Sequence, residues 1–260
     1  MKEILKINNL THQNYHNFSL TINNDSFISI IGPNMCGKTT LFKIISCIIP
    51  TENNIICNDI ILNKKNINKY IKQLGIVLPL KEESFLFETV YEEMSYPLKN
   101  LGYSKPYIDK RIQQLLKLFE LDIINKKIKE LTSYEKQTLL IAISLLHKPK
   151  ILLIDDIFSY QKLTTCLKII KILKSINNLT TIYFSSSLEF LEESNYIYIL
   201  NNNEILLKGT YQNIVNNYEQ LQNIGLEIPF INKLSNDLKE LGIIKKDYSN
   251  LEDLVNEIWK

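Results

Sequence analysis

The 260-residue sequence predicts an α/β fold with a core of parallel strands, and three observations predict it. Strand-like and helix-like segments alternate along the chain, which is typical of a parallel sheet whose strands are connected by helices. The run KILLID at 150–155 is continuously apolar, as in a strand buried on both faces. A glycine-containing loop, GPNMCGKTT at 32–40, joins an apolar strand to a helix-like segment.

The first half of the chain supplies strands and then helices. We expect, in chain order, short strands within 1–31, a helix at 38–49, strands at 55–57 and 74–78, and a helix-rich segment at 88–147 with a break near 102–106. The strands are predicted from short apolar runs such as SFISII. The helix KTTLFKIISCII has apolar residues at helical spacing and stops before a proline.

The second half continues the alternation and ends in a different pattern. After the strand at 150–155 we expect an amphipathic helix at 163–176, a central strand at 180–186, and a closing hairpin of YIYIL and EILLKG around 201–203. From about residue 216 the pattern becomes helical and charged. This change predicts a C-terminal appendage.

Composition excludes several classes of protein. The chain is 45% hydrophobic and 22% charged, which is ordinary for a globular protein, and its net charge of +2 gives no argument for a nucleic-acid partner. We expect no signal peptide and no membrane-spanning helix, because the start lacks a basic and then apolar region and no apolar run is long enough. The four cysteines form no CxxC pair, and the three histidines are too scattered for a metal cage.

The loop GPNMCGKTT matches the phosphate-binding pattern G-x-x-x-x-G-K-[ST] and has the strand-before, helix-after context that the pattern requires. The chain has only seven glycines, where average usage predicts roughly 18, and two of them fall in this loop. We expect the nucleotide phosphates to bind Gly32, Pro33, Asn34, Met35, Cys36, Gly37, Lys38, Thr39 and Thr40.

Individual residues of this loop, and one aspartate outside it, have expected roles in binding phosphate and Mg²⁺. Lys38 is expected to contact the β- and γ-phosphates, and Thr39 is expected to bind Mg²⁺. Asp155 ends the apolar run KILLID and is the expected second partner of the Mg²⁺ ion. The sequence therefore predicts ATP and Mg²⁺ as ligands.

The order of these features resembles an ABC-type ATPase. The segments FETVYEEMSYPLKNLG at 87–102 and LQNIGLEIPFINKLSNDLKELGI at 221–243 are similar to the ATPase subunits of energy-coupling factor (ECF) transporters, which import vitamins and metal ions. The resemblance implies a P-loop NTPase cassette at 1–215, having a mixed sheet with a parallel core, an antiparallel β edge and a helical subdomain at about 80–147. It also implies a helical pairing extension at 216–260.

The resemblance also implies partners and a location. The chain would couple ATP binding and hydrolysis to uptake, pair head-to-tail with a second ATPase, and dock on a membrane-embedded subunit at the cytoplasmic face of the cell membrane. A groove between the helical subdomain and the Pro79 region would receive that subunit, and Ile228, Phe230 and Ile231 would lie in the pairing interface. A heteromer is favoured over a homodimer, because a homodimer would have two altered sites.

The sequence departs from the family where hydrolysis is performed. The Q-loop glutamine is replaced by Pro79, the Walker B glutamate by Asp156, and the switch histidine by Ser186. Proline has no side-chain donor or acceptor, and aspartate carries its carboxylate on a shorter stem. The D-loop aspartate aligns with Lys162. We therefore expect a site that binds ATP and hydrolyses it slowly or not at all.

The partner-facing signature and the adenine platform are altered too. The family signature Leu-Ser-Gly-Gly-Gln reads LTSYE here, so Thr132, Ser133 and Tyr134 would contact the partner's ATP, with Glu135 adding a negative charge. Tyr15 is the candidate that stacks on adenine, with His12 and His16 as alternatives. A solvated loop tyrosine is an equally open interpretation of Tyr15.

Three functions remain open at this point. The leading interpretation is the ATP-binding subunit of an ECF-type importer with weakened hydrolysis. Its main rival is a regulatory or structural subunit that binds nucleotide, closes with an active partner and performs no hydrolysis. A soluble ABC ATPase of DNA repair or translation is disfavoured, because the chain has no coiled-coil insertion, second cassette or basic patch. Genetic drift under a codon bias explains the substitutions less well, since Lys38, Thr39 and Asp155 persist.

Overall fold

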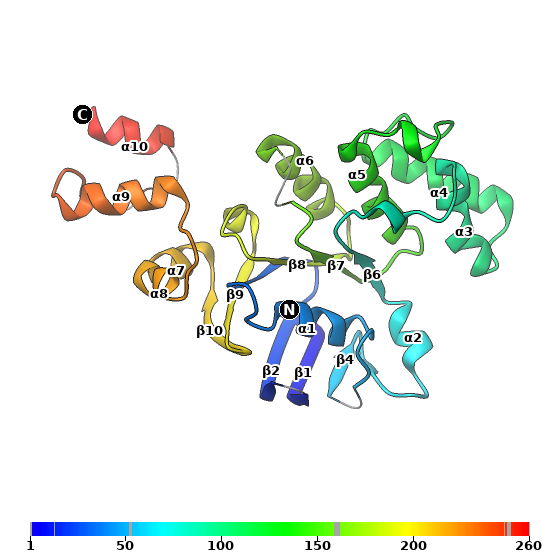
Figure 1. The fold of residues 1–260 in the computed structure, drawn as a ribbon, viewed down its shortest axis with the longest axis horizontal. Helices are drawn as coiled ribbons and strands as arrows, with labels where there is room; N and C mark the ends of the chain where they lie inside the picture. The colour runs from blue at the N-terminus through cyan, green and yellow to red at the C-terminus, as the bar shows by residue number, and fades with distance from the viewer. Residues whose placement is uncertain are drawn as a thin grey trace.

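The computed structural model describes residues 2–12, 14–51, 54–158, 162–246, 248 and 251–259. A six-stranded sheet lies at the centre, with helices α3–α6 on one side and helix α1 with a second sheet on the other (Figure 1). The C-terminal helices extend away from the edge where β9 and β10 lie. The α/β fold predicted from the sequence is confirmed.

The six-stranded sheet has the order β10-β9-β3-β8-β7-β6. Its strands are β3 (Phe27–Ile31), β6 (Leu74–Val77), β7 (Ile151–Asp155), β8 (Thr180–Ser185), β9 (Tyr196–Asn201) and β10 (Glu204–Gly209). All neighbouring pairs are parallel except β9 and β10, which form an antiparallel hairpin at the edge. The first four residues of β7 are fully buried, as a strand covered on both faces requires.

The second sheet is antiparallel and packs over α1 (Lys38–Ile45). Its order is β2-β1-β4-β5, from β1 (Glu3–His12), β2 (Tyr15–Asn23), β4 (Ile55–Cys57) and β5 (Ile60–Ile61). Helix α1 buries Leu41, Phe42, Ile44 and Ile45 between the two sheets. It ends four residues before the predicted position 49, because Cys47 has a left-handed backbone with φ 62°. The short helix α2 (Ile67–Ile71) was not predicted.

The helical subdomain consists of α3 (Val90–Asn100), α4 (Lys105–Leu118) and α5 (Ser133–Ser144), with single turns η1 (Glu82–Ser84) and η2 (Ile128–Glu130). The predicted break lies between α3 and α4, where Gly102 has φ 80°. Glu93 is a buried carboxylate of α3 that accepts hydrogen bonds from the backbone N–H groups of Leu86 and Phe87, both at 2.8 Å. This carboxylate fixes the loop between β6 and α3.

The last third of the chain holds α6 (Leu163–Lys174), the turn η3 (Leu191–Glu193), α7 (Tyr211–Val215), α8 (Tyr218–Asn223), α9 (Phe230–Glu240) and α10 (Leu251–Ile258). One apolar cluster contains Ile197 of β9, Ile214 of α7 and Leu221 of α8. Packing therefore continues across residue 215, and a domain boundary at that point stays a prediction. Within the described ranges, no helix combines the length and apolarity needed to cross a bilayer.

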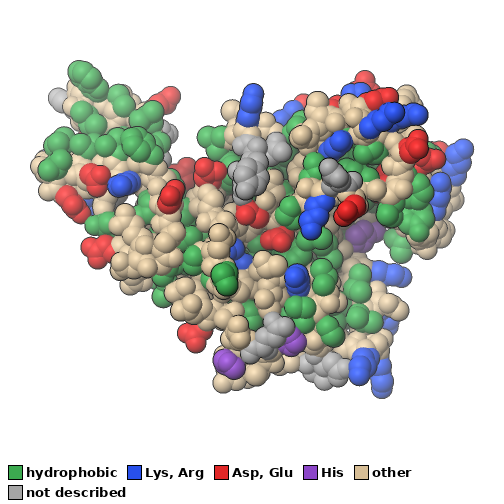
Figure 2. Space-filling view, in the orientation of Figure 1, with side chains coloured by type: hydrophobic (Ala, Val, Ile, Leu, Met, Phe, Trp, Pro, Cys, Tyr) green, Lys and Arg blue, Asp and Glu red, His purple; other side chains and the backbone are tan. Residues whose placement is uncertain are grey.

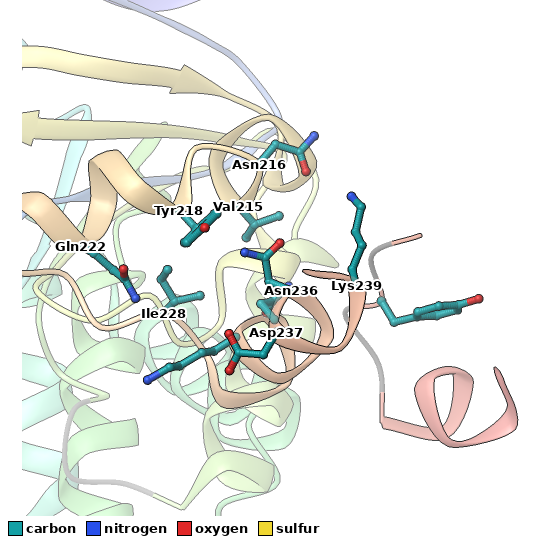
Figure 3. A pocket seen from close by; sticks show the side chains of 11 residues that line it. Val215, Asn216, Tyr218, Gln222, Ile228, Asn236, Asp237 and Lys239 are labelled. Atoms are coloured by element: carbon teal, nitrogen blue, oxygen red, sulfur yellow. The ribbon is translucent and has the colours of Figure 1, made fainter. Parts of the chain in front are cut away.

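The extension formed by α8, α9 and α10 carries exposed apolar side chains. Figure 2 shows them gathered over α9 and α10, and they include Leu241, Ile243, Leu251, Val255, Ile258 and Trp259. Phe230 is 73% exposed, whereas Ile228 packs partly against the cluster that includes Leu221. A cavity of about 260 Å³ lies between α8 and α9, with Tyr218, Gln222 and Asn236 around it (Figure 3). The extension is thus packed more loosely than the sheet.

Candidate functional site

The carboxyl ends of three parallel strands, β3, β7 and β8, meet at one edge of the six-stranded sheet. The loop after β3 is the phosphate loop, Asp155 and Asp156 follow along β7, and Ser185 and Ser186 follow along β8. Strand register places Asp155 opposite Phe184, and Gly32 N–H donates to Ser185 O at 3.3 Å. The structure thus brings together residues that are far apart in the sequence, at the edge where α/β sheets bind ligands.

The phosphate loop is organised around Lys38. Its ammonium donates to Gly32 O at 2.6 Å and to Pro33 O at 2.8 Å, and it lies 3.7 Å from the sulfur of Cys36. Within the part of the chain that the structure describes, the first three amides of α1, at 38–40, have no hydrogen-bond acceptor. Unpaired helix N-terminal amides beside an ammonium favour a phosphate group.

Backbone geometry explains why this loop keeps its two glycines. Gly37 has φ 108°, a left-handed conformation that side chains rarely adopt. A Cβ at Gly32 would overlap Leu200 O and the sulfur of Cys36. Asn34 and Met35 are exposed at the tip of the loop, and Pro33 and Thr40 are half-buried. All nine residues predicted to bind phosphate therefore lie in one strand-to-helix turn.

Asp155 and Thr39 have the chemistry of a Mg²⁺ site. Burial raises the pKa of the half-buried Asp155 carboxyl and neighbouring Asp156 raises it further, while the charges of Lys38 and Lys43 lower it. A cation beside the Asp155 carboxylate would stabilise its negative charge, which burial and neighbouring Asp156 disfavour. Thr39 is exposed at the first turn of α1. Mg²⁺ uses few protein ligands and takes the rest from phosphates and water, so these two residues fit the ion.

Asp155→Asn is expected to stabilise the free protein and to weaken Mg²⁺-dependent ATP binding by about 10- to 100-fold. Because the folded-state pKa lies above the unfolded value, the wild-type protein loses stability as pH rises from the unfolded pKa through the folded one. Asparagine carries no charge, so the variant does not undergo this loss of folding stability at neutral pH. Thermal melts from pH 4 to 8 with and without Mg²⁺, and ATP titrations, test both effects. The exposed Asp122→Asn is the control, and equal behaviour of the two variants would contradict the assignment.

Asp156 is held by a serine that the sequence did not reveal. The hydroxyl of Ser185 donates to a carboxylate oxygen of Asp156 at 3.1 Å, and Ser187 N–H donates to the Ser185 oxygen at 3.1 Å. Asp156 has φ 40°, and its own N–H donates to Phe184 O. Ser185 is buried and Ser186, at the switch position, is half-buried. Pro79 is exposed two residues after β6.

The signature segment LTSYE caps its own helix. Thr132 is the N-cap of α5 and accepts from Glu135 N–H at 3.2 Å. The Glu135 carboxylate accepts from Thr132 N–H at 2.8 Å and from Lys126 at 2.9 Å. These bonds, the backbone one first, lower the pKa of Glu135. The carboxylate is therefore folded back on its own helix, and its charge is partly paired.

The other signature side chains differ in exposure. Thr132 and Ser133 are exposed, so both remain available to a partner. Tyr134 is half-buried and packs against the apolar core of the helical subdomain, so its ring is partly withdrawn from the surface. Lys162, at the D-loop position, is the exposed N-cap of α6.

The structure corrects both interpretations of Tyr15. Its side chain is 0% exposed and lies edge-on to Phe18, with ring centroids 4.9 Å apart, and its hydroxyl donates to Gly37 O at 3.1 Å. A ring enclosed in this way is neither an open platform for adenine nor a solvated loop side chain. His12 is half-buried with an unpaired Nε2, and His16 is exposed. The two histidines remain the adenine-stacking alternatives.

Comparisons with known proteins show which proteins the whole chain resembles. The chain is 28% identical over 250 residues to the energy-coupling factor transporter ATP-binding protein EcfA1 of Oenococcus oeni, covering 94% of this chain and 90% of that protein. It is 28% identical over 246 residues to EcfA of Onion yellows phytoplasma, covering 93% and 91%. These matches confirm the resemblance to ECF ATP-binding subunits.

Solved structures show the same fold. CbiO1 from Clostridium perfringens, described as part of the ABC transporter complex cbiONQ, superposes with a TM-score of 0.79 at 20% identity, covering 94% of this chain and 100% of that one. A dimeric ATP-binding cassette bound to ADP and phosphate superposes with a TM-score of 0.67 at 24% identity, covering 80% and 98%. Residues 15–159, more than half of the chain, match the ABC transporter family. The chain belongs to the ABC transporter family.

Proposed function

We propose that this chain is the ATP-binding subunit of an ECF-type ABC importer that binds MgATP and contributes little hydrolysis. One observation carries the proposal. The intact phosphate loop with Lys38 and the carboxylate of Asp155 share one sheet edge, where the hydrolytic positions hold Pro79, Asp156 and Ser186. The groups needed for binding are present, and the groups needed to activate water are replaced.

ATP binding would proceed by exchange of hydrogen bonds. Lys38 leaves Gly32 O and Pro33 O and contacts the β- and γ-phosphates, which accept stronger charge-assisted bonds. The free amides at the start of α1 receive the remaining phosphate oxygens. Thr39 and Asp155 would hold Mg²⁺, which would supply positive charge against the phosphates of the nucleotide.

Hydrolysis is expected to be slow for geometric reasons. An aspartate places its carboxylate about 1 Å short of a glutamate, and a misplacement of that size costs on the order of 10²-fold in rate. The Ser185 bond ties the Asp156 carboxylate to β8. Ser186 lacks the imidazole of the switch histidine, and Pro79 lacks the Q-loop amide that would orient water or sense Mg²⁺.

A groove on the helical subdomain is the proposed docking site for a membrane-embedded subunit. It measures about 710 Å³ and lies between the loop after β6, which is fixed by Glu93, and the segment that precedes α5. Its apolar residues are Leu80, Phe85, Phe87 and Ile128, and its charged ones are Lys81, Glu88, Lys127, Lys129 and Lys136. This apolar surface with a charged rim is typical of protein interfaces. The chain would thereby be peripheral at the cytoplasmic face of the membrane.

The exposed apolar face of α9 and α10 is the proposed surface for pairing with a second ATPase. A heteromer is favoured, because two copies of this chain would combine two sites that lack the hydrolytic groups. The relatives from Oenococcus oeni and Onion yellows phytoplasma are ATP-binding proteins of energy-coupling factor transporters, so we propose a vitamin or metal ion as the transported cargo.

Purification of the tagged chain from its native membranes tests the proposed assembly. We expect a membrane-embedded subunit and a second ATPase to copurify with it. Lys81→Glu combined with Lys129→Glu should lower the amount of copurified membrane subunit by about tenfold, since reversing rim charges costs more than about 1 kcal/mol at an interface. ATP affinity should not change.

The matched control is Lys110→Glu with Lys117→Glu, which makes the same charge change on the exposed side of α4. Equal loss of the membrane subunit with both pairs would mean that net charge, and not the groove, governs docking. Recovery of the wild-type chain with no membrane subunit would contradict the importer assignment.

A second candidate is a regulatory subunit that binds ATP and performs no hydrolysis. The capture of Asp156 by Ser185 and the self-capping of α5 by Glu135 both favour it. The two candidates share the fold, ligand and partners, so only the hydrolysis rate at this chain's site separates them.

A further inference from the structure

We propose that Tyr15 and Asn203 clamp the phosphate loop from two sides and are positioning residues for the polyphosphate of the nucleotide. The inference rests on the proposed ATP binding and goes beyond it by assigning two residues that lie outside the phosphate-binding motif. Tyr15 comes from β2 of the antiparallel sheet, and Asn203 comes from the turn between β9 and β10. Both contact the same short segment, Cys36–Gly37.

Asn203 approaches the loop from the edge of the large sheet. Asn202 and Asn203 have φ 48° and 63°, the left-handed pair of a tight two-residue hairpin turn. Asn203 N–H donates to Cys36 O at 2.9 Å. Its side-chain oxygen lies against Gly37, where an added Cβ would overlap it. The turn therefore contacts the loop through both its backbone and its side chain.

Tyr15 approaches from the other sheet. Its hydroxyl donates to Gly37 O, which also accepts Leu41 N–H at 2.9 Å as the first hydrogen bond of α1. Because the ring is fully buried and held by Phe18, the hydroxyl is a fixed anchor. An added Cβ at Gly37 would lie 2.7 Å from this hydroxyl. The missing side chain of Gly37 thus lets both clamp residues approach.

The clamp sets the direction of two amide groups. In a trans peptide the C=O and N–H groups point in opposite directions. A bond from Asn203 that fixes Cys36 O therefore aims the N–H of Gly37 away from the hairpin. A bond from Tyr15 that fixes Gly37 O likewise aims the N–H of Lys38 toward the open end of α1. These are the amides that a phosphate loop presents to its anion.

The test uses the full chain and two probes, MgATP and magnesium tripolyphosphate, which has phosphates but no adenine. Tyr15→Phe removes only the hydroxyl. Asn203→Gly removes only the side chain, because glycine keeps the left-handed turn and the N–H donor. Tyr15→Phe should weaken the binding of both probes equally, by about 3- to 10-fold, the effect of one lost hydrogen bond. Asn203→Gly keeps the N–H bond to Cys36 O and loses only the side-chain contact with Gly37, so it should weaken the binding of both probes equally and by a smaller factor.

Two matched controls separate positioning from general stability. Asn202→Gly alters the exposed neighbour in the same turn and should bind both probes as the wild type does. Phe18→Leu loosens the packing around Tyr15 while keeping its hydroxyl. It should therefore lower the melting temperature more than Tyr15→Phe does, but it should weaken tripolyphosphate binding less than Tyr15→Phe does.

Other outcomes would overturn the clamp. Wild-type affinity of both Tyr15→Phe and Asn203→Gly would show that the loop needs neither contact. A loss confined to MgATP in a Tyr15→Ala variant, with tripolyphosphate unaffected, would assign Tyr15 to adenine. If the wild-type chain bound neither probe, the proposed ATP binding would be wrong. The clamp, which depends on that binding, would then be wrong as well.

Discussion

Lys38→Ala is expected to weaken MgATP binding by about 10²- to 10³-fold. The ammonium is the only lysine charge whose hydrogen bonds lie inside the phosphate loop, within the described residues. Charge-assisted bonds to phosphate contribute about 1.5–3 kcal/mol each, and two of them account for a loss of this size. Isothermal titration with MgATP measures the affinity directly.

The control for Lys38→Ala is Lys72→Ala, an exposed lysine at the end of α2. It makes the same change of net charge outside the phosphate loop and should leave affinity within twofold of the wild type. Thermal melts must accompany the titrations, because alanine also leaves the carbonyls of Gly32 and Pro33 without their donor. A folded Lys38→Ala protein with wild-type affinity would contradict the site.

Restoring the family residues at three positions is expected to raise turnover. The variant Pro79→Gln, Asp156→Glu and Ser186→His returns a water-orienting amide, a longer carboxylate and an imidazole to the same sheet edge. We expect the hydrolysis rate at this chain's own site to rise by about 10²-fold or more, since each lost function costs on the order of 10²-fold and the effects do not add. A steady-state phosphate-release assay measures it.

The same three substitutions on a Lys38→Ala background provide the control. That protein should show no rise, because nucleotide no longer reaches the restored groups. If the triple variant bound ATP normally and turned over no faster than the wild type, the limiting defect would lie elsewhere, for example in the LTSYE segment or in the partner.

Much of the fold and part of the site were predictable because their signals are local. The phosphate loop is a contiguous motif between a strand and a helix, and the run KILLID identifies a strand buried on both faces. Since parallel strands end at one edge, the sequence also predicted that Asp155 lies near the loop. The early end of α1 was missed because apolar spacing continues past Ile45, while the left-handed Cys47 does not follow from spacing.

The remaining contacts were not predictable because they join distant segments. The run of three asparagines predicted a hairpin turn but not that Asn203 would contact Cys36. Tyr15 was assigned from the family's order of motifs, and only the packing of two sheets shows that its ring is enclosed. Nothing in the string FSSSLEF distinguishes Ser185, which holds Asp156, from Ser186 at the switch position. The pairing of Glu135 with Lys126 likewise depends on the approach to α5.

The most direct test of reduced hydrolysis is the ATPase rate of the complex purified from native membranes, with wild-type chain and with Asp156→Asn. Asparagine is nearly isosteric and tolerates the left-handed φ of 40° at this position, so ATP binding should persist. We expect the two rates to agree within twofold, because the complex hydrolyses ATP at the partner's site. A fall of about tenfold or more, the loss expected when a working general base is removed, would contradict it and identify Asp156 as an active catalytic base.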